Sequence, residues 1–196
     1  MADYNELIPI IKKWEGGFVN DPDDSGGATN KGVTLSTFRT WFGANKTVND
    51  LKALTDDQWI YIFINGYWNQ CKASQINDQN IANIIVDWAW ASGPVTAIKK
   101  VQAIVGTDAD GIVGPKTLAA INSANQRQLF NKIKDARLQF VENLAEQRPK
   151  DKKFLQGWKN RINSFLFETG AANMGMYGIL AAGAVFVLLL IARKWK

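Results

Sequence analysis

The chain has 196 residues, with 23 lysines and arginines, 18 aspartates and glutamates, one cysteine and no histidine. The missing histidine excludes a Ser-His-Asp triad, a Cys-His pair and an HExxH zinc site, and a single cysteine excludes a disulfide framework. Acid–base chemistry would therefore fall on aspartate and glutamate, and the length predicts one compact domain or one domain with two lobes.

The charges are distributed unevenly along the chain. Residues 1–93 carry a net charge of −4, residues 94–170 carry +6 and residues 171–196 carry +3. An acidic first half and a basic second half suit a protein that acts on one part of an anionic polymer while holding another. A solvated basic helix face explains the charge alone equally well.

Most of the chain is predicted to be helical. Apolar residues spaced three and four apart predict an amphipathic helix over residues 3–14, which Gly16-Gly17 ends. Residues 18–34 are rich in Gly, Asp and Asn and predict turns with a small hairpin. Further helices are predicted over residues 55–64, 78–91, 95–105, 117–123, 126–147 and 154–167.

The C-terminal segment has a different character. Residues 174–192 contain no charged side chain and are followed by RKWK. A helix of that length spans roughly 28 Å, close to the hydrocarbon thickness of a bilayer. The pattern predicts a single C-terminal transmembrane helix, with a buried core helix as the alternative. Gly178 and Ala182 predict weak self-association of that helix, and the polar N-terminus predicts no signal peptide.

Glu15 is the first candidate catalytic residue. It lies at the end of the first predicted helix beside Trp14 and Phe18, where the helix dipole and apolar neighbours both disfavour ionisation of a carboxyl group. A glutamic acid kept protonated in this way can act as a general acid. Gly16-Gly17 leaves room for a bulky ligand. The alternative is a solvated residue before an ordinary glycine cap.

The loop after Glu15 is dense in carboxylates, hydroxyls and glycines. A second carboxylate, or a water held by a threonine, would complete glycoside-hydrolase chemistry. Asp21, Asp23 and Asp24 are also hard oxygen ligands, but their spacing does not fit an EF-hand, so we expect no metal. We expect no cofactor either, because the loop lacks the Gly-Lys-Ser/Thr ending of a phosphate loop.

The run EGGFVNDPDDSGGATNKGVT, from Glu15 to Thr34, resembles the N-terminal signature of glycoside hydrolase family 108. These are lysozyme-like N-acetylmuramidases of phages, prophages and Gram-negative bacteria. The resemblance covers residues 5–168 and includes DGIVGPKT, from Asp110 to Thr117. It implies a mainly α, lysozyme-like fold with a small Gly-rich loop or hairpin region. The expected parts are a catalytic lobe (1–93), a helical peptidoglycan-binding lobe (94–170) and a transmembrane anchor with a basic tail (171–196).

The resemblance also assigns site residues. It makes Glu15 the general acid, Asp24 the aspartate of the family's D-x-G-G motif, and Thr29 the threonine that follows. Asp24 and Thr29 would stabilise the developing cation or position water. Asp23 remains an alternative to Asp24, because Asp23 and Thr29 match the D-x-x-G-x-x-T spacing of phage-type lysozymes.

Four residues are expected to bind the sugar: Tyr67, Trp68, Asp87 and Ser92. Tyr67-Trp68 follows a predicted helix break at Gly66 and is the candidate cleft wall, whereas most other tryptophans are expected in the core. Ala91 departs from the family pattern, because relatives usually have asparagine there, and this removes a polar sugar contact. Cys71 is expected to be buried.

The sequence therefore predicts a lysozyme-type peptidoglycan hydrolase that cleaves the β-1,4 bond between N-acetylmuramic acid and N-acetylglucosamine. We expect a membrane-anchored phage lytic enzyme, located in the phage virion inner membrane or the host inner membrane and acting in the periplasm. Its partners would be glycan strands and, through residues 174–192, lipid. No nucleic acid is expected, because no recognition module accompanies the charge. The alternatives are a non-catalytic peptidoglycan-binding or virion structural protein, and a lytic transglycosylase.

Five basic residues near the end of the second lobe are expected to form a solvated basic face, with attraction to anionic peptidoglycan or lipid headgroups as the alternative. They are Lys150, Lys152, Lys153, Lys159 and Arg161.

Overall fold

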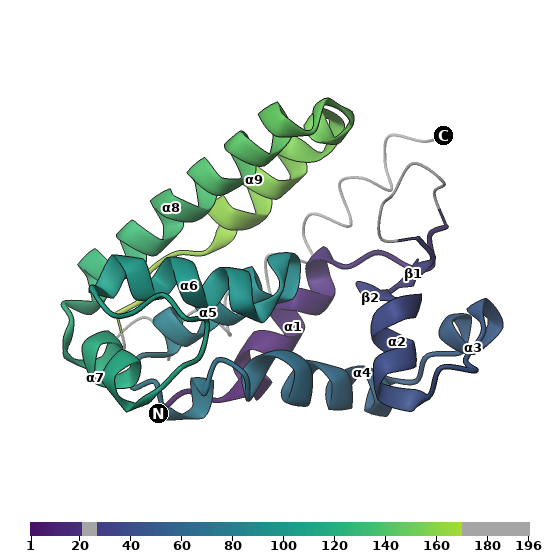
Figure 1. The fold of residues 1–196 in the computed structure, drawn as a ribbon, viewed down its shortest axis with the longest axis horizontal. Coiled ribbons are helices and arrows are strands. Elements are labelled where there is room, and N and C mark those ends of the chain that lie inside the picture. Colours follow the sequence, from purple (N-terminus) through teal and green to yellow (C-terminus); the bar gives the residue numbers. More distant parts are fainter. Residues whose placement is uncertain (21–26, 170–196) are drawn as a thin grey trace, which may run out of the picture. The chain divides into compact units, whose positions relative to one another are not determined.

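A computed structural model describes residues 1–20 and 27–169 of the chain (Figure 1). Residues 1–165 form one compact, mainly helical unit. The α-helices of the described residues are α1 (Tyr4–Trp14), α2 (Leu35–Phe42), α3 (Val48–Lys52), α4 (Asp56–Phe63), α5 (Gln79–Ser92), α6 (Pro94–Val105), α7 (Pro115–Ser123), α8 (Gln126–Gln147) and α9 (Leu155–Ser164). Shorter elements are strands β1 (Thr29–Asn30) and β2 (Val33–Thr34), a π-helical turn (Ile64–Trp68) and two 3-10 helices (Ala73–Gln75, Pro149–Phe154).

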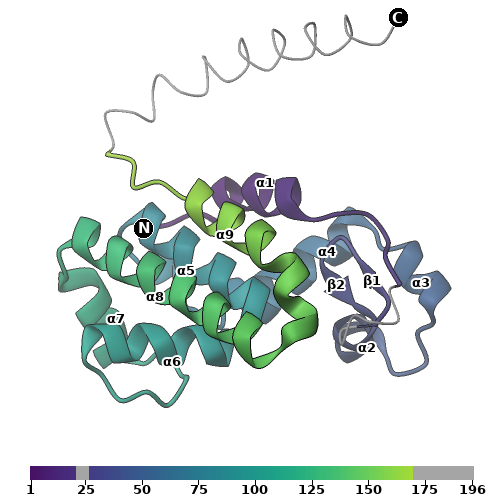
Figure 2. The same cartoon turned by 90° about the horizontal axis from the view of Figure 1, so that it is seen from above.

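Helix α5 forms the centre of the core. Asp78 caps its N-terminus by accepting hydrogen bonds from two main-chain N–H groups. Every residue from Ile81 to Trp90 is buried, as is typical of a helix enclosed by others. Helices α6 and α8 pack against α5, and α9 lies beside α8 (Figures 1 and 2). Because α5 is enclosed in this way, the side chains that it presents to a site are held firmly in place.

The predicted hairpin is present as strands β1 and β2. Its two turn residues, Lys31 and Gly32, both have positive φ (49° and 77°), as a two-residue hairpin requires. Trp59 stabilises the turn, because its Nε1 donates a hydrogen bond to the main-chain oxygen of Lys31 at 2.8 Å. In strand β1, Asn30 Nδ2 donates to the main-chain oxygen of Leu51 at 2.8 Å. The hairpin is therefore fixed to helices α3 and α4.

The predicted helix break at Gly66 is wrong, because the chain continues from α4 through the π-helical turn Ile64–Trp68. A Cβ atom on Gly66 would lie 3.4 Å from Cζ2 of Trp41, so glycine lets that ring pack closely. Trp68 at the end of the turn is 1% exposed, and its Nε1 donates to Ser74 Oγ at 2.7 Å. The turn thus places Trp68 in the core.

The predicted membrane-spanning helix requires a correction. Among the helices of residues 1–20 and 27–169, none is both long and apolar enough to cross a membrane. Helix α8 has 22 residues but carries charges along its length, and the apolar α5 has only 14 residues. This finding overturns the transmembrane helix in the predicted fold and the single-pass location in a virion or host inner membrane. It also leaves the predicted lipid contact and helix self-association without support.

The residues for which that helix was predicted, 174–192, lie outside the described residues.

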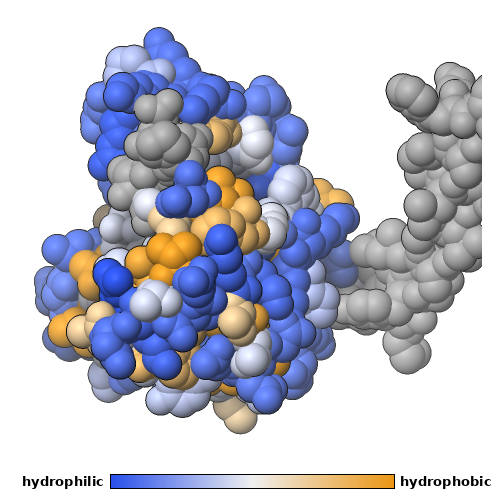
Figure 3. All heavy atoms as spheres, turned by 90° about the vertical axis from the view of Figure 1, so that its right-hand side faces the viewer, coloured by the Kyte–Doolittle hydropathy of each residue, from blue (hydrophilic) through white to orange (hydrophobic). Residues whose placement is uncertain are grey.

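On the face shown in Figure 3, most of the surface of the described residues is hydrophilic, and apolar residues gather near its middle.

Candidate active site

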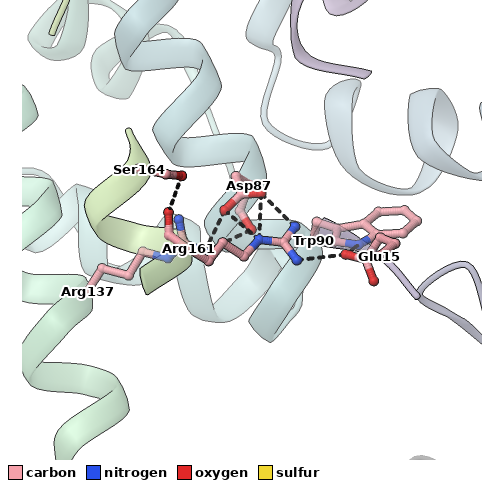
Figure 4. Close-up of polar contacts among 6 residues, drawn as sticks. All are labelled: Glu15, Asp87, Trp90, Arg137, Arg161 and Ser164. Atoms are coloured by element: carbon pink, nitrogen blue, oxygen red, sulfur yellow. Dashed lines mark hydrogen bonds and ion pairs between the residues drawn. The ribbon is translucent and has the colours of Figure 1, made fainter. Parts of the chain in front are cut away.

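Glu15 lies at the end of α1, where its main-chain N–H still bonds to the oxygen of Ile11 at 3.2 Å. Leu7 and Ile11 bury one face of the helix and so fix the direction in which the chain leaves it. The Glu15 side chain is 15% exposed, and its Oε1 accepts hydrogen bonds from Trp90 Nε1 at 2.8 Å and Arg161 Nη1 at 2.7 Å (Figure 4). Among the described residues, Oε2 accepts no hydrogen bond.

Glu15 faces a cavity of about 380 Å³, within the range of small-molecule sites. The hairpin forms one side of this cavity, and the C-terminal end of α5, the second half of α8 and the middle of α9 form the rest. Glu15 is the only carboxylate among its described lining residues, and several of the others are apolar. The lining residues are Glu15, Thr29, Gly32, Thr34, Trp90, Ala91, Ser92, Arg137, Phe140, Val141, Leu144, Trp158, Arg161 and Ile162.

Behind Glu15, a chain of ion pairs runs into the core. Arg161 Nη2 lies 2.7 Å from Asp87 Oδ1, and Arg161 Nε lies 3.1 and 3.2 Å from the two Asp87 oxygens. Arg137 Nη2 lies 2.6 Å from Asp87 Oδ2. Positive and negative groups therefore alternate from Glu15 through Arg161 and Asp87 to Arg137 (Figure 4).

The buried position of Asp87 is tolerated because of its two arginines. Its side chain is 0% exposed. Burial alone would raise the pKa of Asp87, but the guanidinium groups of Arg137 and Arg161 hold that pKa below its ordinary value. Burial likewise opposes the charge on Arg161, yet the Asp87 and Glu15 carboxylates raise the pKa of Arg161. Both groups are therefore ionised at neutral pH.

Asp87→Asn is expected to destabilise the fold by about 3–5 kcal/mol at neutral pH, because it leaves buried guanidinium groups without their partner. The lowered folded-state pKa means that ionised Asp87 contributes stability above about pH 3.9, its ordinary pKa. That contribution is lost as the pH falls through the folded-state value. The difference between wild type and D87N should therefore shrink in acid, as measured by urea unfolding at several pH values. Asp135→Asn, at an exposed position of α8, is the control, and a pH-independent D87N difference would contradict the assignment.

Glu15 occupies the space that a side chain at position 32 would need, so this position requires glycine. A Cβ atom there would lie 2.6 Å from Glu15 Cδ, closer still to Glu15 Oε2, and 3.0 Å from Trp90 Cζ2. Its φ of +77° also favours glycine. The hairpin backbone therefore packs directly against the carboxyl group.

Two family models match consecutive parts of the chain. Residues 8–93 match Glycosyl hydrolase 108, and residues 96–163 match Predicted Peptidoglycan domain. Among solved structures, "Structure of Brucella abortus SagA" is 34% identical, with a TM-score of 0.76, and the match covers 83% of this chain and 90% of that one. The chain belongs to glycoside hydrolase family 108. No curated protein sequence gave a significant match.

As a member of family 108, the chain is a glycoside hydrolase that acts on peptidoglycan, as the resemblance implied. The predicted division between residues 93 and 94 falls between the two matched regions. Both regions lie within the compact unit of residues 1–165, and both line the cavity. The first region supplies Glu15 and Trp90, and the second supplies the wall formed by α8 and α9.

The structure places two of the predicted catalytic residues of this family 108 protein. Glu15 and Thr29 both line the cavity. Thr29 Oγ1 donates a hydrogen bond to the main-chain oxygen of Gly27 at 3.1 Å. Asp24 and its alternative, Asp23, lie outside the described residues.

Of the four predicted sugar-binding residues, only one lines the cavity. Ser92 lines the cavity, next to the divergent Ala91. Tyr67 is not among the lining residues, but it is half-buried with its ring centroid 4.7 Å from that of Trp90, which lines the cavity. Burial, together with the Glu15 charge, raises the pKa of Tyr67. Trp68 and Asp87 are enclosed in the core and are not among the lining residues.

The sequence interpretation missed the basic part of the site. Arg161 was placed on a solvated face, yet its side chain is 14% exposed and bonded to Glu15. Arg137 and Gly32 were not proposed as site residues, and Trp90 was one of the tryptophans considered as sugar-stacking platforms but expected mostly in the core. The sequence does contain a signal for Arg137, because this residue lies one helical turn after the buried Ile133 and one turn before the buried Val141. A charge within an apolar stripe indicates a buried partner.

Other reactive groups do not contribute to the site. Cys71 is fully buried, as predicted, and burial raises the pKa of its thiol to about 12, so it is a poor nucleophile. In the described part of the chain, no group of three or more Cys, Asp or Glu side chains is arranged to hold a metal ion.

Proposed function

We propose that this family 108 hydrolase is an N-acetylmuramidase, which hydrolyses the β-1,4 bond between N-acetylmuramic acid and N-acetylglucosamine with Glu15 as general acid. The supporting observation is that Glu15 is the only carboxylate among the described residues lining the cavity, and that two N–H donors hold its Oε1. A role in phage lysis stays a prediction that rests on the family resemblance alone, because the membrane anchor that also suggested it is not supported.

To act as an acid, the Glu15 carboxylate must first take up a proton. We propose that it does so at Oε2, the oxygen that neither Trp90 nor Arg161 contacts, and that this proton is then transferred to the substrate. Trp90 and Arg161 both bond to Oε1, so Oε2 can face the glycosidic oxygen. As the bond between muramic acid C1 and that oxygen breaks, the oxygen takes the proton and positive charge develops on the sugar ring. A water molecule then adds its oxygen to C1 and gives up a proton to a nearby carboxylate or to solvent, and Glu15 regains a proton from solvent, which completes the cycle.

Thr29 is suited to hold that water. Its hydroxyl proton is donated to the Gly27 main-chain oxygen, so Oγ1 is free to accept a hydrogen bond from water in the cavity. Asp24, or its alternative Asp23, is proposed to stabilise the developing cation or to accept the water proton. Ser92 and Tyr67 remain proposed sugar contacts.

Digestion of purified Gram-negative peptidoglycan in oxygen-18 water tests this function. A muramidase should release fragments with reducing N-acetylmuramic acid ends that carry the heavy oxygen, as measured by mass spectrometry. Anhydromuramic ends without the label would identify a lytic transglycosylase, and labelled reducing N-acetylglucosamine ends would identify cleavage of the other bond. Pelleting with sacculi without cleavage would identify a binding protein.

A further inference from the structure

The second matched region is described as a peptidoglycan domain, yet two of its arginines lie behind the proposed catalytic carboxyl group. We infer, on the basis of the proposed function, that Arg161 is a positioning residue for Glu15 and that the buried Asp87–Arg137 pair holds Arg161 in place. The region would then contribute directly to the rate of bond cleavage, in addition to any contribution to glycan binding.

All three nitrogens of the Arg161 guanidinium group have carboxylate partners. Nε and Nη2 contact Asp87, and Nη1 contacts Glu15 Oε1 at 2.7 Å. Two-point attachment to one carboxylate fixes the plane of a guanidinium group. The direction of the remaining Nη1 is therefore set by Asp87, and this direction determines where the Glu15 oxygen is held.

Asp87 is in turn held by Arg137, whose Nη2 contacts the other carboxylate oxygen at 2.6 Å. The Arg137 side chain is almost fully buried and comes from α8, whereas Asp87 comes from the enclosed α5. No hydrogen bond or ion pair within the described residues joins Arg137 to Glu15. Within the described residues, the contacts that link Arg137 to Glu15 run through Asp87 and Arg161.

Helix α5 holds Glu15 by a second, direct route. Trp90 lies three residues after Asp87, so both side chains project from the same face of the helix. The Trp90 indole N–H and the Arg161 guanidinium both bond to Glu15 Oε1. One rigid helix thus fixes the same oxygen twice, and the other oxygen is left for proton transfer.

A simple glycan-holding role fits Arg161 poorly. Its side chain is mostly buried, and each of its nitrogens is already bonded to protein. Lys159, two residues earlier in α9, provides the comparison. It pairs with Glu142 at 2.7 Å on the surface, is about a third exposed, and is absent from the cavity lining.

The test compares three variants of the full chain: Arg161→Gln, Arg161→Lys and Lys159→Gln. R161Q and K159Q remove the same charge from the same helix, whereas R161K keeps the charge but offers one nitrogen in place of three. We expect both Arg161 variants to lower kcat on solubilised glycan chains by roughly tenfold to a hundredfold, with KM and pelleting on sacculi unchanged. K159Q should retain the wild-type kcat.

The indole N–H resonance of Trp90, assigned by its loss in Trp90→Phe, gives a readout that does not depend on activity. It should move in R161K and R161Q and stay in place in K159Q, while thermal unfolding confirms that each variant is folded. Loss of pelleting or a raised KM with unchanged kcat in the Arg161 variants would overturn the inference, as would an unmoved Trp90 resonance. If the wild type cleaves nothing, the proposed function fails, and the resonance still tests the position of Glu15.

Discussion

Glu15→Gln is expected to lower kcat on peptidoglycan by roughly 10²–10⁴-fold, the usual contribution of a general acid. Glutamine has almost the same shape as glutamate, and its amide oxygen can accept the hydrogen bonds from Trp90 and Arg161. It cannot, however, supply a proton to the leaving oxygen. The loss should therefore fall on kcat, with little change in pelleting on sacculi or in thermal unfolding.

Glu6→Gln is the matched control, because Glu6 lies in the same helix, is exposed and is absent from the cavity lining. It should keep the wild-type rate, measured as the release of new reducing ends. Cleavage by E15Q at the wild-type rate would show that another group supplies the proton. Asp21, Asp23 and Asp24, which lie outside the described residues, would then be the first to examine.

The long helices could be predicted because their stability is encoded locally. Helix α8 has the predicted bounds, from Gln126 to Gln147. Helix α4 lies within the predicted range 55–64, and Thr55 and Gln58 form a capping box at its start. Helix α5 lies close to the predicted range 78–91, and ten of its consecutive residues are buried. Periodicity and capping are properties of a few adjacent residues, so they can be seen in a single sequence.

Helices α2 and α3 and the π-helical turn depend on tertiary contacts and were missed. Helix α3 has only five residues, too few for an isolated helix to be stable. Helix α2 has eight residues and is anchored by the buried Phe38. The π-helical turn replaced a predicted break because Gly66 accommodates Trp41, a neighbour 25 residues away in the sequence. Such contacts leave no periodic pattern.

Contacts between residues far apart in the sequence also limited the prediction of the site. The motif around Glu15 drew attention to the carboxyl group, but its partner Arg161 lies 146 residues later. The prediction for Glu15 considered only the helix end and the adjacent Trp14 and Phe18, and so included no cation. Asp87 was found from the family pattern and expected to contact sugar, whereas burial places it behind Arg161.

Gly32→Ala is expected to lower kcat by roughly 100-fold or more, because it displaces the carboxyl group from its donors. The added Cβ would lie 2.6 Å from Glu15 Cδ, so one of the two must move. The hairpin cannot retreat easily, since Trp59 bonds to the main-chain oxygen of Lys31 and Asn30 bonds to that of Leu51. The Glu15 side chain must therefore move, which breaks its hydrogen bonds to Trp90 and Arg161.

Gly106→Ala separates this displacement from backbone strain. Gly106 has a similar φ of +73°, but nothing lies within 4 Å of the position that a Cβ atom would take there, and it caps α6 away from the cavity lining. G106A should lose roughly 1–2 kcal/mol of unfolding free energy, the cost of a left-handed alanine. G32A should lose that amount and, in addition, the contribution of the broken Glu15 hydrogen bonds, and only G32A should lose activity. Equal kcat values for G32A and G106A, measured as reducing-end release, would show that the hairpin yields and that Gly32 does not set the position of Glu15.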